Sequence, residues 1–147
     1  MPVSDLSMTR AMLRLTQARD LAESVYAATT SVKRSCARTR LNALFRLASD
    51  GHDLPHPACR TDRRPSTLRP RPNVPRVRRW CPVCGTELRP IRTRGKPTTA
   101  CPPGEGRPCA NVIVRLNELR RIVVALPADQ RSILAACARE WASEIGR

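Results

Sequence analysis

Proline is concentrated in the middle of this chain, and that pattern limits the fold more than any other feature. Twelve of the fourteen prolines lie between Pro55 and Pro108 in a sequence of 147 residues. Proline fixes φ and has no N–H to donate, so this stretch cannot hold a long helix. Regular helices are therefore expected only in the two flanking segments.

The N-terminal flank has helical periodicity. Its apolar residues recur at spacings of three and four in two stripes: Ala11, Leu15, Ala18, Ala22 and Val25, then Ala37, Leu41, Leu44, Phe45 and Ala48. The hydroxyl-rich residues 29–31 have poor helix propensity and mark a break, and Asp50-Gly51 supplies a C-terminal stop. The sequence predicts an N-terminal helical region over residues 1–51, as either a hairpin or one long helix.

The C-terminal flank repeats this pattern. Its apolar positions are Val112, Leu116, Leu119, Val123 and Leu126, followed by Leu134, Ala138, Trp141 and Ile145. Pro127 stands where a new helix can begin, and Asp129 in the first turn of that helix is favoured by the helix dipole. We therefore expect a helical pair at the C-terminus.

Residues 52–80 alternate proline with polar or charged residues. Such a composition buries little apolar surface, so an extended or disordered linker is expected. The predicted fold is mainly α with a small four-cysteine zinc finger. Its regions are the helices of 1–51, the linker of 52–80, and a finger with a C-terminal helical pair over 81–147.

The cysteines indicate a metal site rather than disulfides. Their number, seven, is odd. Cys81 and Cys84 are separated by two residues and followed by Gly85, which can adopt the positive φ of a tight turn. The segment up to Cys109 has too few apolar residues to fold without a metal. We predict a zinc ion, preferred over iron, bound by Cys81, Cys84, Cys101 and Cys109.

The order of these features resembles the treble-clef and zinc-ribbon families of zinc fingers. A cysteine knuckle is followed by two short strands, residues 86–93 and 98–101, and then by a ligand at the start of a helix. The resemblance covers Cys81 to Cys109 and implies a structural zinc beside a β-hairpin. Seven residues separate Cys101 from Cys109, whereas those families usually place about two to four residues there.

Enzymatic alternatives lack the residues that they require. A thiol-disulfide active site needs a βαβ unit around Cys81 and Cys84, and a zinc deaminase needs a His-x-Glu sequence. The last histidine is His56, so a treble-clef nuclease also lacks its catalytic histidine. Four thiolate ligands leave no open position for water on the zinc. We therefore expect a protein that is not an enzyme.

The charge of the chain indicates a polyanionic partner. Lys and Arg total 27 against 12 Asp and Glu, a net charge of +15. Arginine forms bidentate contacts with phosphate, so we predict nucleic-acid binding, to DNA rather than RNA. An acidic protein is the alternative partner. The predicted contact residues are Arg63, Arg64, Arg69, Arg71, Arg76, Arg78, Arg79, Arg92, Arg94 and Lys96.

The alternative function is a zinc-stabilised adaptor that binds a protein, or a second copy of itself, through the stripe that contains Val112, Leu116, Leu119 and Val123.

The first ten residues contain Asp5 and Arg10 but no apolar signal core, and no apolar run reaches the roughly 18 residues of a membrane helix. A cytoplasmic protein without a membrane partner is therefore expected.

Overall fold

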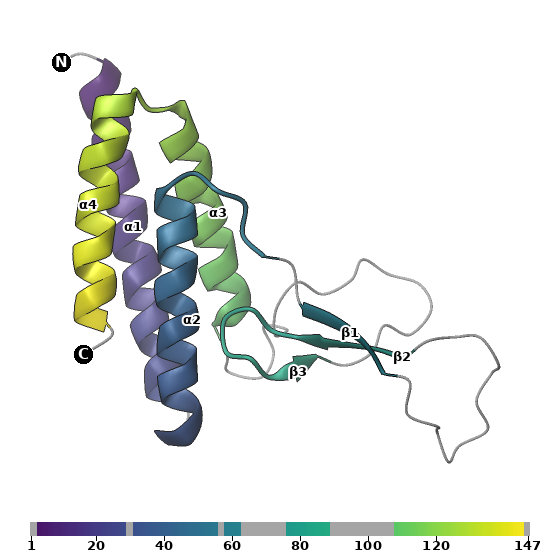
Figure 1. Ribbon diagram of the computed structural model, residues 1–147. Coiled ribbons are helices and arrows are strands. Elements are labelled where there is room, and N and C mark those ends of the chain that lie inside the picture. Colours follow the sequence, from purple (N-terminus) through teal and green to yellow (C-terminus); the bar gives the residue numbers. More distant parts are fainter. Residues whose placement is uncertain (1–2, 29–30, 56–57, 63–75, 89–107, 146–147) are drawn as a thin grey trace.

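Four helices and a small sheet make up the described part of the chain. A computed structural model (Figure 1) describes residues 3–28, 31–55, 58–62, 76–88 and 108–145. The elements are α1 (Val3–Ala28), α2 (Ser31–Ser49), β1 (Ala58–Asp62), β2 (Arg76–Trp80), β3 (Glu87–Leu88), α3 (Cys109–Ala125) and α4 (Ala128–Ile145). The prediction of a mainly α fold is confirmed.

The N-terminal region is a helical hairpin, which decides between the two alternatives left by the sequence. α1 ends at Ala28 and α2 begins at Ser31, so the break falls at the expected hydroxyl-rich residues. α2 ends at Ser49, directly before the Asp50-Gly51 stop that the sequence predicted. Gly51 has φ of +79°, and its N–H and that of His52 donate to the carbonyls of Ala48 and Leu47. This is a Schellman motif, which satisfies carbonyls at the end of a helix.

The four helices form a bundle in which the two hairpins interlock. α1 packs most extensively against α3, and α2 against α4, whereas the helices joined by a short loop touch each other least. Figure 1 shows α1 and α4 running in one direction and α2 and α3 in the other. Arg14 pairs with Glu118 at 3.4 Å, and Arg19 pairs with Glu144 at 2.9 Å, so ion pairs also join one hairpin to the other.

The predicted apolar stripes form the core of this bundle. Every member of the two N-terminal stripes is buried, and so are Val112, Leu116, Leu119, Val123 and Leu126. Leu134, Ala138 and Ile145 complete the set from α4. Trp141 is half-buried, and the Arg19 guanidinium lies 6.0 Å from the centre of its ring. Both ends of the chain thus contribute to one core.

The turn between α3 and α4 is fixed by an arginine. Pro127 lies between the two helices, as the sequence predicted for the start of α4. Arg131 Nε donates to the carbonyl of Leu126 at 2.8 Å, and its Nη2 donates to the carbonyl of Val124. A cation at the carbonyl end of a helix is favoured by the helix dipole. Arg131 therefore caps α3 from the next helix.

The sheet extends away from the side of the bundle (Figure 1). β1 and β2 pair antiparallel over five residues each, from Ala58 opposite Trp80 to Asp62 opposite Arg76. β3 pairs only with Arg79 and Trp80 at the base of β2. Residues 58–62 and 76–80 were expected to belong to an extended or disordered linker, but here they are paired strands. Neither stretch contains a proline, so each can complete a ladder.

Among the helices that the structure describes, none is both long enough and apolar enough to cross a bilayer.

Candidate metal centre

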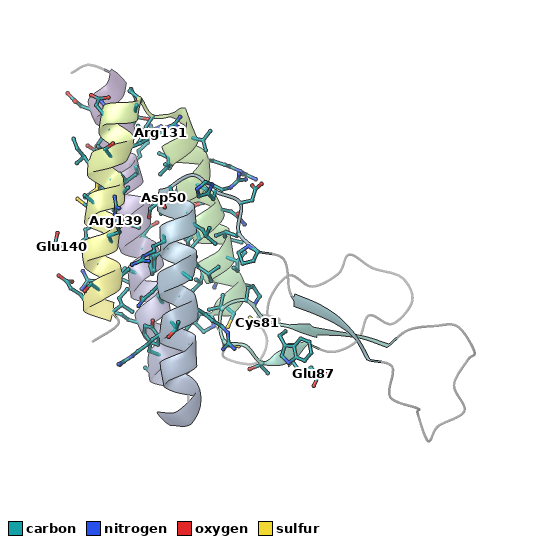
Figure 2. The ribbon with its side chains drawn as sticks, in the orientation of Figure 1. Asp50, Cys81, Glu87, Arg131, Arg139 and Glu140 are labelled. Atoms are coloured by element: carbon teal, nitrogen blue, oxygen red, sulfur yellow. The ribbon has the colours of Figure 1, made fainter. Side chains whose placement is uncertain are left out.

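Three cysteines meet where the sheet joins the bundle. Cys81 directly follows β2, Cys84 lies in the turn after it, and Cys109 is the first residue of α3. All three are buried, and their sulfur atoms lie within 4.8 Å of one another. Figure 2 shows Cys81 beside the helices, at the inner end of the sheet. We call these residues the cysteine cluster.

The turn that holds Cys81 and Cys84, residues 81–86, is closed by backbone hydrogen bonds. The Gly85 N–H donates to the Cys81 carbonyl at 2.8 Å, and the Cys81 N–H donates to the Thr86 carbonyl at 2.9 Å. Gly85 has φ of +73°, the left-handed conformation that its position after the second cysteine predicted. This knuckle brings two sulfurs that are close in sequence to one side of the turn.

The cluster stabilises negative charge on one sulfur. Hydrogen bonds from Cys109 and then Cys81 lower the pKa of the Cys84 thiol well below its ordinary value, against the opposing effect of burial. The Thr86 hydroxyl, 3.2 Å from Cys84 Sγ, acts in the same direction. The pKa of Cys109 is raised, first by its hydrogen bond with Cys81 and then by that with Cys84 and by burial. The arrangement therefore favours one thiolate, at Cys84, and opposes loss of the proton at Cys109; deprotonation of all three buried thiols would require a cation.

An arginine of the bundle contacts the knuckle directly. Arg40 Nη1 of α2 donates to the Cys84 carbonyl at 3.4 Å. Its guanidinium also lies against Gly85, so closely that a side chain at position 85 would overlap it. Arg40 thus brings positive charge beside the cluster and joins α2 to the knuckle. No sequence pattern marked it, because 44 residues separate it from Cys84.

The donor set suits a zinc ion. Zinc binds thiolates at about 2.3 Å with tetrahedral geometry, which places two sulfurs about 3.8 Å apart. The sulfurs of the cluster lie within 4.8 Å and are buried, so the three cysteines could bind such an ion with little rearrangement. Cys101, the fourth predicted ligand, lies outside the described residues. So does most of the predicted hairpin between Thr86 and Cys101.

Three of the residues that were predicted to contact nucleic acid lie in the part of the chain that the structure describes. Arg76, Arg78 and Arg79 belong to β2, and their strand register is defined. The other predicted contacts lie outside the described residues: Arg63, Arg64, Arg69, Arg71, Arg92, Arg94 and Lys96. Arg60, the first residue of the same arginine-rich run, lies directly opposite Arg78 in the strand register.

Comparison of this chain with known protein families, with characterised proteins and with solved structures finds no significant match.

Proposed function

We propose that this protein is a non-enzymatic nucleic-acid-binding protein, with DNA as its ligand and a zinc ion as a structural element. The observation that carries the proposal is the pairing of Arg60 with Arg78 across the β1–β2 ladder. We call these two strands, residues 58–62 and 76–80, the arginine ribbon.

The charge of the arginine ribbon favours an anionic ligand. Its ten residues contain four arginines and one aspartate. Like charges directly opposite each other destabilise a sheet. Asp62 faces Arg76, but Arg60 faces another arginine. A phosphate backbone would remove this repulsion and would form bidentate contacts with the guanidinium groups.

A bound zinc ion would fix the end of the ribbon that adjoins the bundle. Cys81, Cys84 and Cys109, which lie close together in the structure, are the proposed protein ligands, with Cys101 as the proposed fourth. When bound, the ion supplies folding free energy, on the order of 10–16 kcal/mol in small zinc domains. Because Cys81 continues β2 and Cys109 begins α3, the site joins the ribbon to the bundle. We propose no chemical reaction for it.

The adaptor alternative receives no support from the bundle. Val112, Leu116, Leu119 and Val123, the proposed docking stripe, are fully buried in the core of this chain. A partner could reach them only by displacing the helices that pack on α3, chiefly α1 and then α2. The exposed large apolar residues of the described helices do not extend that stripe: Leu6, Leu13, Val114, Val124 and Ile133.

A salt series tests the proposed function. The zinc-loaded protein is titrated with duplex DNA, single-stranded DNA and RNA, and log affinity is plotted against log salt concentration. With about six phosphates neutralised, a fourfold rise in salt should lower the affinity on the order of a thousandfold.

Two matched triple variants locate the contact. Replacing Arg76, Arg78 and Arg79 by Ala should weaken binding and flatten the salt slope. The control replaces three exposed arginines of the bundle, Arg10, Arg46 and Arg121, by Ala, which changes the net charge equally. Absence of binding at low salt for all three nucleic acids would overturn the proposal, as would equal effects of the two variants.

A further inference from the structure

From the register and the shape of the arginine ribbon, we infer that it enters the major groove of duplex DNA and contacts guanine there through Arg60 and Arg78. This inference rests on the proposed function and goes beyond it, because phosphate binding alone needs no groove and no particular base.

The shape of the ribbon suits that groove. β3 pairs only with Arg79 and Trp80, so the outer part of the ribbon, residues 60–62 and 76–78, consists of two strands alone among the described residues. This part extends away from the helices in Figure 1. Two paired strands lie about 4.8 Å apart. The major groove of B-form DNA, about 12 Å wide and 8.5 Å deep, admits a two-stranded ribbon.

The register places the charges on one face. Strand positions alternate between faces, so Arg76 and Arg78 share a face, and their partners Asp62 and Arg60 share it with them. Arg79 alternates to the other face, with its partner Cys59. On this face the register therefore sets one arginine opposite another at Arg60 and Arg78, whereas Arg76 stands opposite an acidic residue, Asp62.

The spacing of the Arg60–Arg78 pair suits neighbouring base pairs. Arg60 and Arg78 stand directly opposite each other, so their Cα atoms are about 4.5–5.5 Å apart, between one and two base-pair steps of about 3.4 Å. An arginine that reaches a base edge in the major groove has one favoured partner, the O6 and N7 acceptors of guanine. We therefore expect preference for sites with neighbouring guanines.

The same geometry excludes duplex RNA as the preferred ligand. The major groove of A-form RNA is deep and too narrow for side chains to read its bases. A protein that used the ribbon only against phosphates would bind DNA and RNA duplexes of the same sequence with similar affinity.

The test removes the guanine acceptor without changing the backbone. Two duplexes of one guanine-rich sequence are compared, one of them with 7-deazaguanine, which lacks N7, in place of guanine. The zinc-loaded protein should bind the modified duplex at least about tenfold more weakly, as expected for loss of a bidentate base contact. Equal affinity for the two duplexes would overturn the inference and leave the proposed function intact.

A matched pair of substitutions assigns the effect to the ribbon face. Arg78→Lys keeps the charge but loses the bidentate fork, and Arg79→Lys makes the same change on the other face. We expect Arg78→Lys to reduce the discrimination between the duplexes, because only Arg60 keeps its bidentate contact, and Arg79→Lys to preserve it. Zinc content and circular dichroism report whether both variants fold. Equal discrimination by both folded variants would overturn the inference, whereas absence of binding to either duplex at low salt would overturn the proposed function as well.

Discussion

The bundle and the sheet with its knuckle are stabilised in different ways. The bundle buries apolar side chains from all four helices in one core. In the knuckle, the buried residues are Cys81, Val83 and Cys84. Those sulfurs meet Cys109 at the start of α3, and Arg40 of α2 holds the knuckle from the other side. One region is thus held by its own core, and the other by the cysteine cluster and by contacts with its neighbour.

This difference predicts that the fold of the knuckle depends on the bundle more than the fold of the bundle depends on the knuckle. Burial of apolar surface stabilises the bundle whether or not a metal is bound. The knuckle adds only Cys81, Val83 and Cys84 to that same core, so its geometry depends on the cysteine cluster and on its contacts with the bundle. Damage to the bundle should therefore disrupt the knuckle, while damage to the cluster should leave most of the bundle folded.

The largest effect is expected from a charge in the bundle core. Leu119 is fully buried on α3, and Leu119→Asp would place an unpaired carboxylate there. Such burial costs several kcal/mol, comparable with the whole stability of a small domain. Circular dichroism should show loss of helix, and zinc binding should weaken as well. Leu119→Ala is the milder control, with an expected cost of about 2–5 kcal/mol. A folded Leu119→Asp protein would contradict the described core.

Loss of a cysteine ligand should abolish metal binding but leave the helices of the bundle folded. Cys84→Ser removes a thiolate of the cluster, so zinc content should fall from about one ion per chain to near zero, as measured by elemental analysis under reducing conditions. The far-UV signal of the helices should persist. The matched control is Cys137→Ser, which changes a half-buried cysteine of α4 outside the cluster and should retain the metal. Metal-free protein before any substitution would contradict the site itself.

A smaller effect is expected at the contact between Arg40 and Gly85. Gly85→Ala forces a side chain into the left-handed region, which costs about 1–2 kcal/mol, and also overlaps the guanidinium of Arg40. Zinc affinity, measured by competition with a chelator, should fall. In an Arg40→Ala background, Gly85→Ala should lower the zinc affinity only by the amount that the backbone strain at position 85 causes. Equal penalties in both backgrounds would show that Arg40 does not press on the knuckle.

The helices and their buried faces could be predicted from sequence because a local period determines them. The members of the stripes that begin at Ala11, Ala37 and Val112 are all buried, and the breaks at residues 29–30 and at Pro127 fall where propensity placed them. The prediction of an extended or disordered linker over residues 52–80 did not foresee its two paired strands, because proline content was averaged over the whole stretch. The proline-free windows 58–62 and 76–80 carried the missed signal.

The candidate site was predictable only in part. The spacing of Cys81 and Cys84 and the place of Cys109 at a helix start are local features, and the structure brings all three together. The contact of Arg40 with the knuckle depends on how α2 lies relative to the sheet. The choice of helix pairs, α1 with α3 and α2 with α4, likewise depends on tertiary packing, because a stripe indicates which face is buried and not which helix it contacts.

The interlocked hairpins have a consequence for synthesis on the ribosome. α1 and α2 find their main packing partners in α3 and α4, so the N-terminal hairpin cannot bury its stripes when it first emerges. From the end of α2 at Ser49 to the end of α3 at Ala125 the ribosome adds 76 residues, which takes about 4–15 s at about 5–20 residues per second. For that interval the nascent chain exposes apolar helix faces, which is the condition under which chaperones bind. Helical cores usually form quickly, because most of their contacts are local. This core cannot form until the last third of the chain has been synthesised.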